Sequence, residues 1–219
     1  MSRYGNGVSK SEPAANGRAG HADRRRAALL DAARQVVLER GMASTRIADI
    51  AKATNVSGGL VHYHFATKDD LMAEMLRATS EVEQRHLSEI IDGRASALDR
   101  LDRVMRYYIP RTRTDQSWIL WIEAWAAGLR APVIQAILYE LERAWLNALE
   151  RVIRDGVEAG EFTCPDPAAS AERLDALLDG LLARNTVHPG AISRRRLLEH
   201  VRTAAAREVG LQREDFPAS

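Results

Sequence analysis

The chain has 219 residues, and its single cysteine, Cys164, excludes an intrachain disulfide scaffold. Hydrophobic residues make up 46% of it, enough for a buried core, but no apolar run approaches the roughly 20 residues that span a bilayer. Residues 1–66 contain ten Lys and Arg against five Asp and Glu, so an anionic partner is expected at this end. With one cysteine and no secretory signal pattern, the chain is expected in the cytoplasm and not in a membrane.

Residues 1–22 are rich in Gly, Ser, Ala and Asn, which predicts a disordered tail. From residue 23 onward, apolar residues recur at helical spacing, without the sustained alternation typical of strands. The chain is therefore predicted to be all-α, with about nine helices, of which the first three form a compact head. Helices are expected at 23–40, 58–64, 68–92, 95–109, 115–128, 132–158, 167–186 and 190–208, with one more between Thr45 and Thr54.

The segment from Thr45 to Leu71 has the layout of a helix–turn–helix that reads DNA. The Thr45 hydroxyl is expected to cap its first helix. Asn55 lies at the turn, where the chain needs a left-handed residue and where Asn is tolerated best after glycine. Val56 is expected to pack between the two helices, and the Ser57 hydroxyl to cap the second.

The second helix of this motif carries side chains suited to DNA. Val61 and Phe65 are four residues apart and are expected to face inward. The remaining directions belong to Leu60, His62, Tyr63 and His64. These side chains can bond phosphates and base edges or touch a thymine methyl, although a solvated helix end is the alternative for Tyr63 and His64. His62 and His64 diverge by about 200° on a helix, so they do not predict a metal site.

Residues 41–71 resemble the DNA-binding domain of the tetracycline-repressor family. The residues that match its pattern, at matching spacing, are Gly41, Thr45, Ile50, Ala51, Ala53, Val56, Ser57, Gly59, Tyr63, His64, Phe65, Lys68 and Leu71. Asn55, Gly58 and His62 depart from the pattern and leave the preferred DNA sequence open. The helical remainder of the chain agrees with the fold of that family.

The resemblance implies how the head would meet DNA. It places in the major groove Ser57, Gly59, Leu60, His62 and Tyr63. It places on phosphates Thr45, Arg46, His64 and Lys68. Three arginines that open the first helix could reach the backbone or a minor groove, or could form a solvated basic helix start: Arg24, Arg25 and Arg26.

Residues 118–129 form an unusually aromatic and apolar helical segment. Its tryptophans, which share one side of the helix, are Trp118, Trp121 and Trp125. They are expected either to pack the core or to line a cavity, where ring faces suit flat aromatic or apolar ligands and organic cations. Tyr107 and Tyr108 are further candidates for this cavity.

Glu123 is the only charged residue of the tryptophan segment. A carboxylate on a mostly buried helix needs a partner. The candidates are an arginine, such as Arg106 or Arg130, and a cationic ligand, so Glu123 is also a candidate ligand-binding residue.

The predicted helices at 167–186 and 190–208 carry broad apolar faces, and Gly180 within the first is expected to permit close helix approach. In the tetracycline-repressor family, the last two helices form the dimer interface. The resemblance therefore implies a homodimer that presents two recognition helices to successive major grooves, with intrachain packing as the alternative. Residues 156–162, with the tryptophan segment and Asp179, resemble the branch typified by the choline-responsive repressor and leave the ligand open.

We therefore predict a ligand-responsive DNA-binding regulator, a repressor released from a palindromic operator by a small molecule. The alternative is a helical protein-interaction module without a DNA role. No HExxH, phosphate-binding glycine loop or G-x-S-x-G motif is present, so neither catalysis nor a cofactor is expected. The expected domains are a helix–turn–helix domain at 23–67, a ligand-binding and dimerisation domain at 68–208 and a C-terminal tail at 209–219. The helix that begins at Lys68 joins both domains and is the expected lever between them.

Overall fold

In the computed structural model, the described residues are 13–111 and 116–217, with side chains described from residue 21 onward. Within this part of the chain there are nine α-helices and no strand, which confirms the all-α prediction. The helices are α1 (Pro13–Arg40), α2 (Ile47–Ala53), α3 (Gly58–His64), α4 (Lys68–Ile91), α5 (Ala97–Tyr108), α6 (Ser117–Gly128), α7 (Pro132–Glu158), α8 (Pro167–Val187) and α9 (Arg194–Glu208), followed by a 3-10 turn, η1 (Arg213–Asp215).

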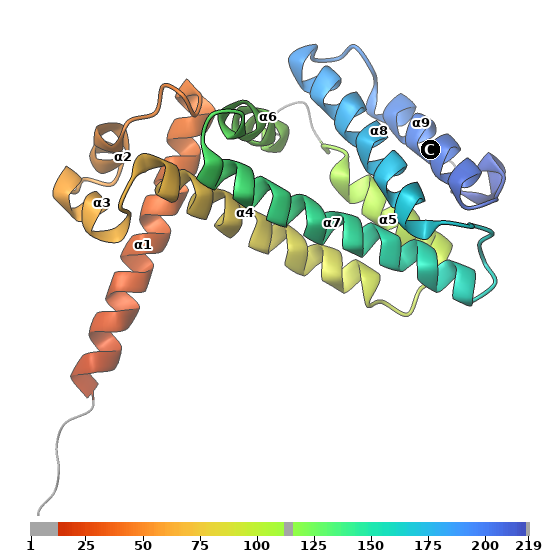
Figure 1. Cartoon of the computed structure of the whole chain (residues 1–219), viewed down its shortest axis with the longest axis horizontal. Helices are drawn as coiled ribbons and strands as arrows, with labels where there is room; N and C mark the ends of the chain where they lie inside the picture. Colours follow the sequence, from red (N-terminus) through yellow and green to blue (C-terminus); the bar gives the residue numbers. More distant parts are fainter. Residues whose placement is uncertain (1–12, 112–115, 218–219) are drawn as a thin grey trace, which may run out of the picture.

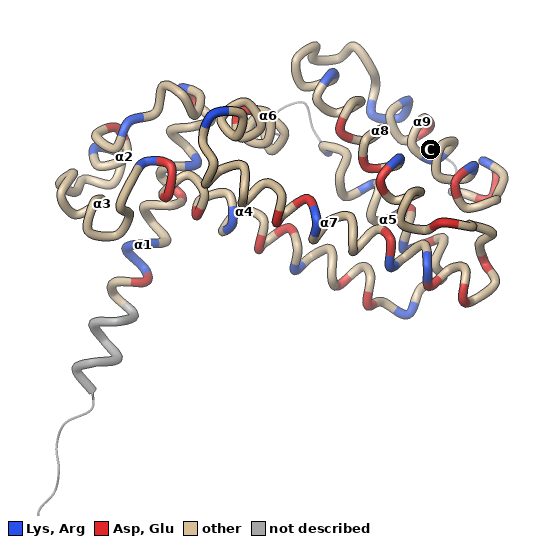
Figure 2. Tube along the Cα trace, viewed as in Figure 1, with Lys and Arg blue, Asp and Glu red and all other residues tan. Residues whose placement is uncertain are grey.

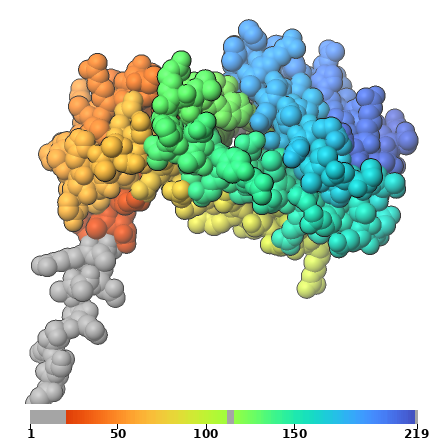
Figure 3. Space-filling view, viewed as in Figure 1, coloured from red at the N-terminus to blue at the C-terminus, as the bar shows by residue number. Residues whose placement is uncertain are grey.

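The helices form an elongated molecule with a small head at one end. Helices α1, α2 and α3 make the head, and α8 and α9 lie at the opposite end (Figure 1). The long helices α4 and α7 run side by side between the two ends, and they are the most extensively packed pair of helices. In the space-filling view, the head and the α8–α9 pair occupy opposite ends of the surface (Figure 3).

Helix α1 begins at Pro13, ten residues before the start predicted at residue 23, so residues 13–22 of the expected disordered tail are helical. Proline is favourable at a first helical position, and the segment that follows is rich in alanine. Because the rest of α1 is packed in the head, extending it requires only propagation and no new nucleation. Residues 1–12 of the predicted tail lie outside the described residues.

The expected C-terminal tail is also packed, as far as Pro217. Val209 and Phe216 are buried against the core, and the turn η1 lies between them. The backbone N–H of Leu211 donates to the carbonyl of Ala206, which folds the chain back after α9. Apolar side chains at these positions therefore keep the segment on the fold, which corrects the prediction for 209–217.

The buried core consists of two clusters. One fills the far end, between α5, α7, α8 and α9. The other begins in the head, with residues such as Leu29, Ile50 and Val61, and continues into α4, α6 and α7 through residues such as Leu71 and Ile137. The domain boundary expected after residue 67 therefore does not coincide with a break in the core.

A buried ion pair ties the far end together. The Arg202 guanidinium donates to both carboxylate oxygens of Asp102, with Nε to Oδ1 at 2.7 Å and the second contact at 3.2 Å. Both residues are almost fully buried, and Arg202 also donates to the carbonyl of Pro217. The pair thus joins α5, α9 and the end of the described chain.

Among the described residues, every helix falls short of the length and apolarity that a membrane crossing requires.

Candidate nucleic-acid interface and ligand cavity

The turn between α2 and α3 has the predicted geometry. Asn55 has a φ of 54°, the single non-glycine residue with a positive φ in the described part of the chain. The N–H of Val56 then donates to the carbonyl of Ala51, which closes the turn. The Ser57 hydroxyl accepts from the backbone N–H of Leu60 at 3.3 Å, as its predicted capping role requires.

Helix α3 turns one face into the head and the other to solvent. Val61 and Phe65 are buried, as expected from their spacing. The Tyr63 side chain is 81% exposed, and its ring meets that of His64 edge-on at 5.2 Å between centroids. The predicted groove-facing residues Ser57, Gly59 and His62 are also exposed, whereas Leu60 is half-buried. The exposed face therefore offers a hydroxyl, an imidazole and a phenol around two glycines, with room for a close approach by another surface.

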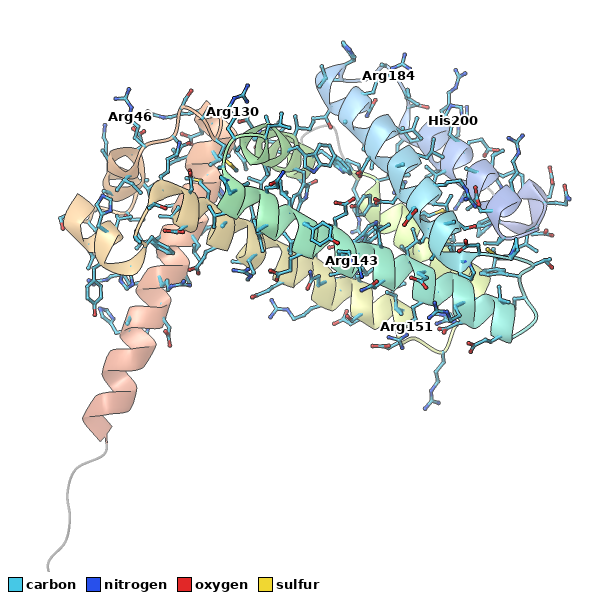
Figure 4. All side chains as sticks on the ribbon, viewed as in Figure 1. Arg46, Arg130, Arg143, Arg151, Arg184 and His200 are labelled. Carbon is cyan, nitrogen blue, oxygen red and sulfur yellow. The ribbon has the colours of Figure 1, made fainter. Side chains whose placement is uncertain are left out.

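The residues predicted to contact phosphates differ in their exposure and in their hydrogen bonds within the protein. Arg46 is exposed, and its side chain points away from the head (Figure 4). His64 is half-buried. The Lys68 ammonium donates hydrogen bonds to the carbonyls of Met42 and Ala43 at 3.2 and 3.4 Å, and so connects α4 to the turn after α1.

Thr45 differs from both of its predicted roles. It is 1% exposed, and its hydroxyl donates to the carbonyl of Gly41, so it is not available to a phosphate. Arg46, not Thr45, is the N-cap residue of α2, and its backbone N–H donates to the Asp49 carboxylate. Thr45 instead closes the turn that follows α1, where a hydroxyl can satisfy a free carbonyl at a helix end.

The three arginines at the start of the predicted first helix lie in different environments. Arg26 forms an ion pair with Glu74, and its guanidinium lies 5.0 Å from the centre of the Phe65 ring, so it packs α1 against α3 and α4. Arg24 and Arg25 are exposed, and Arg25 bonds the ring of His21. Figure 2 shows the Lys and Arg positions of the head on α1 and α2, while acidic and basic residues alternate along α4 and α7.

A cavity of about 680 Å³ opens between α4, α5, α6, α7 and α8. Five of the six predicted ligand-binding residues line it: Tyr107, Tyr108, Trp118, Trp121 and Trp125. The Tyr108 ring meets Trp118 edge-on at 5.6 Å, and Trp118 in turn meets Trp125 at 5.8 Å. These rings form a continuous wall, so the tryptophans do not serve the core alone.

The cavity also contains residues that were not among the ligand-binding residues predicted from the sequence. Trp145 stacks on Tyr108 with 4.0 Å between ring centroids and completes the aromatic wall. Asp175 and Asp179 line the cavity from α8, and Glu142 lines it from α7. The sequence contained a hint of this site, because Asp175 and Asp179 are two carboxylates four residues apart on the apolar face of a helix. A single sequence does not show whether such polar residues on an apolar face line a cavity.

The two aspartates lie in a poorly hydrated environment. Burial raises the pKa of Asp175 to about 6, partly offset by the nearby Trp145 indole and increased further by Glu142. Burial also raises the pKa of Asp179 to about 7, with smaller contributions from the negative charges of Asp175 and Glu142. A cavity that combines aromatic faces and such carboxylates suits an organic cation.

Glu123 is not part of the cavity lining. Its carboxylate accepts a hydrogen bond from the backbone N–H of Met42 at 2.8 Å, in the turn after α1. The predicted arginine partners are engaged elsewhere, Arg106 near Asp102 and Arg130 with the carbonyl of Ala126 at the end of α6, so Glu123 pairs with neither of them. Its predicted role in ligand binding gains no support from the cavity lining. The carboxylate satisfies a free backbone group at a helix end and joins α6 to the head.

Gly180 also differs from its expected role. A Cβ at this position would have no atom within 4 Å, so the glycine does not mark a close helix approach. It lies on the cavity side of α8, between Asp179 and Ala183 in the lining. The missing side chain leaves space in the cavity.

Two family models match separate parts of this chain. Residues 29–75 match the family described as "Bacterial regulatory proteins, tetR family", and residues 97–210 match "BetI-type transcriptional repressor, C-terminal". The HTH-type transcriptional regulator BetI of Agrobacterium fabrum is 28% identical over 166 residues, which cover 74% of this chain and 77% of that protein.

Two further proteins are similar to this chain. The HTH-type transcriptional repressor KstR2 of Mycobacterium tuberculosis is 34% identical over 83 residues, but these span 38% of this chain and 42% of that repressor. A crystal structure of a putative transcriptional regulator from Saccharomonospora viridis in complex with choline aligns with a TM-score of 0.74 and 26% identity. That alignment covers 82% of this chain and 94% of the other.

Proposed function

The chain belongs to the tetR family of bacterial regulatory proteins and has a BetI-type repressor C-terminal domain, and from this premise we propose that it represses transcription until a small organic cation fills its cavity. The observation that carries the effector class is the aromatic wall of Tyr108, Trp118 and Trp145 in a cavity that also holds Asp175 and Asp179. Ring faces and carboxylates both attract positive charge, so together they favour an organic cation as the ligand.

The DNA-binding part of the proposal rests on α3. Its exposed face, led by Tyr63, enters the major groove, and Arg46 and Lys68 approach phosphates beside it. A homodimer formed through α8 and α9 would present two such helices to a palindromic operator. The exposed position of Tyr63, away from the core, supports this use of the helix more than the alternative of an interaction module without a DNA role.

The effector part of the proposal draws on the relatives as well. The Saccharomonospora viridis regulator, at 26% identity, was crystallised with choline. We take choline as the first effector to test here, because its quaternary ammonium group suits the aromatic wall and its positive charge suits the carboxylates. The effector would act on a protein of the cytoplasm, where the operator is.

We propose that α6 and α4 together transmit the effect of ligand binding from the cavity to the head. Helix α6 places Trp118 and Trp125 in the cavity and, on another face, bonds the head through Glu123. A ligand that shifts α6 against α7 therefore acts directly on the turn after α1. The long helix α4, expected from the sequence to be the lever, carries cavity residues and head residues as well, so both helices connect the two sites.

Genomic footprinting of the full chain, followed by binding to the sites it finds, tests the proposal. We expect a palindromic duplex to bind with strong salt dependence, and choline to weaken that binding by about 5–150-fold. The neutral isostere 3,3-dimethylbutan-1-ol is the control for charge and should have little effect. Operator binding that no organic cation weakens would contradict the effector class, and the absence of any specific site would contradict the repressor itself.

A further inference from the structure

We propose that Asp175 and Asp179 form a proton-binding site inside the cavity and that a cationic effector binds by displacing its proton to solvent. This inference rests on the proposed effector class and adds a regulatory property to the same site. The repressor would then respond to an organic cation more strongly in neutral and alkaline conditions than in acid.

The position of the two carboxylates is the first argument. Residues four apart on a helix lie on the same face, and on α8 both Asp175 and Asp179 line the cavity. Asp175 is only 6% exposed, and Asp179 is half-buried one turn further along. Two negative charges this close, in a site with limited access to water, repel each other and are poorly solvated.

The charges around the site do not relieve this repulsion. The other charged or titratable residues of the lining are Glu83 on α4, Tyr107 and Tyr108 on α5, Arg111 after α5 and Glu142 on α7. Among the described residues, α6 and α9 contribute no charged side chain to the lining, and no Lys or Arg is among the groups that shift the pKa of either aspartate. Arg111 acts instead on Tyr107. In the ligand-free protein the proton is thus the counter-charge that the aspartates hold.

The alternative counter-ion, a metal, does not fit. Within the described ranges, no group of three His, Cys, Asp or Glu converges well enough to hold a metal ion. The cavity also has aromatic faces, which suit a larger cation whose charge is distributed over several methyl or methylene groups. The indole N–H of Trp145 is buried beside Asp175 and favours the ionised form of its carboxylate, against the larger effect of burial.

The exchange itself is a simple balance. In the ligand-free state one carboxyl keeps its O–H bond, because its pKa is raised to about 6 at Asp175 and about 7 at Asp179. When the cation enters, its charge favours the ionised form, the O–H bond breaks and the proton leaves to solvent. One cation replaces one proton, so the charge of the site is conserved. The two aspartates share this titration, so the proton belongs to the pair.

The sign of the pH dependence follows from this balance. Below the pKa of the ligand-free site, the cation must displace a proton and its affinity falls as the pH falls. Above it, the carboxylates are already ionised and the affinity is independent of pH. With a pKa of about 7 and one proton released, the affinity at pH 8 exceeds that at pH 5.5 by about 30-fold.

Isothermal titration of the full chain with choline and with tetramethylammonium, in buffers of different ionisation enthalpy, tests the inference. At pH 6 we expect about one proton released per cation, and at pH 8.5 close to none. Asp179→Asn should bind these cations more weakly, release less proton at pH 6 and lose most of the pH dependence. The matched control is Glu172→Gln, an exposed carboxylate on the same helix outside the cavity lining, which should behave as the wild type.

A ligand-free measurement keeps the inference independent of the choice of cation. Tryptophan fluorescence should follow a titration with a midpoint near pH 7, because Trp145 lies beside Asp175, and Asp179→Asn should remove or shift it. The absence of this titration, or cation binding that is equally tight at pH 5.5 and 8 without proton release, overturns the exchange and leaves the proposed function intact. If neither cation binds at any pH, the proposed effector class is contradicted and the exchange with it.

Discussion

The carboxylate of Glu123 accepts a hydrogen bond from the backbone N–H of Met42 at 2.8 Å, across 81 residues of sequence. Glu123 lies on α6, which also carries three tryptophans of the cavity, and Met42 lies in the turn that connects α1 to α2. A single rigid helix therefore contacts the effector site and the base of the DNA-binding head. This contact gives the coupling between the two sites a residue that can be tested.

We expect Glu123→Ala to uncouple the sites. Without the carboxylate, the N–H of Met42 loses its partner, and movement of α6 is no longer transmitted to the turn, so the effect of choline on operator affinity should shrink from the about 5–150-fold typical of allosteric coupling toward none. Choline binding to the cavity should persist. Glu123→Gln is the matched control, because its amide oxygen can still accept the same hydrogen bond. A full response to choline in the alanine variant would show that α6 does not act through this contact.

Tyr63→Ala should remove specific operator binding while the helical circular dichroism stays unchanged. The side chain is 81% exposed and packs no core, so its loss affects DNA and not folding. A lost contact to a base typically weakens binding by about 1–3 kcal/mol. Tyr139→Ala is the matched control, since this tyrosine is also exposed, at 64%, but lies on α7 and not on the predicted recognition helix. Equal operator affinity of the Tyr63 and Tyr139 variants would contradict the groove contact.

Substitutions of Gly180 should separate stability from effector binding. Gly180→Ala adds a methyl group into open space in mid-helix, so it should stabilise the fold by about 1 kcal/mol. Gly180→Leu should fill the cavity and weaken choline binding, without loss of operator binding. Urea unfolding and titration calorimetry measure the two effects.

Gly156 on α7 is the control position for Gly180→Ala, because a Cβ at Gly156 would overlap the ring of Phe162. Gly156→Ala should therefore destabilise the fold although it too replaces a helical glycine by alanine. If both alanine variants were destabilised alike, the space beside Gly180 would not be open as described.

Breaking the Asp102–Arg202 pair should be strongly destabilising. Asp102→Ala leaves a buried guanidinium without its carboxylate, and removal of one partner from such a pair typically costs about 3–5 kcal/mol. Urea unfolding of the full chain measures this loss. The exposed pair Arg151–Asp92 provides the control, because Asp92→Ala should change the free energy of unfolding by less than about 1 kcal/mol.

The cavity aspartates should also make stability depend on pH. Their pKa values, about 6 for Asp175 and about 7 for Asp179, exceed the about 4 of an unfolded chain, so the folded state holds protons that the unfolded state has lost. Their contribution is therefore fully present below about pH 4 and declines as the pH rises to about 7. Thermal unfolding should show Asp179→Asn gaining stability relative to the wild type between pH 5 and pH 8. A difference that stays constant over this range would argue against a raised pKa.

The helices and the DNA-reading motif could be predicted from sequence because their signals are local. The spacing of Val61 and Phe65, the left-handed turn at Asn55 and the cap at Ser57 each involve residues within a few positions of one another. The spacing of the tryptophans on α6 likewise placed them on one side of the helix, although it left core packing and a cavity wall as alternatives. These features depend on helix geometry, which the sequence expresses directly.

The remaining features depend on which helices meet in space. The partner of Glu123 is a backbone group 81 residues away, which no side-chain pattern indicates. Trp145 and Asp175 come together only because α7 packs against α8, and the burial of Thr45 depends on how the turn after α1 closes. Long-range packing of this kind is not visible in one chain without its structure.

The core that runs from the head into α4, α6 and α7 limits how this protein can be recombined with its relatives. A hybrid sensor that joined this effector cavity to another regulator's operator specificity, with the splice after residue 67, would set Leu71 and Ile137 against foreign side chains. The transplant would have to include the first half of α4 and complementary surfaces on α6 and α7. The same shared core opposes the exchange of whole segments during evolution. New combinations of effector and operator specificity are therefore expected to arise more readily by point substitutions in the cavity and on the DNA-facing side of α3.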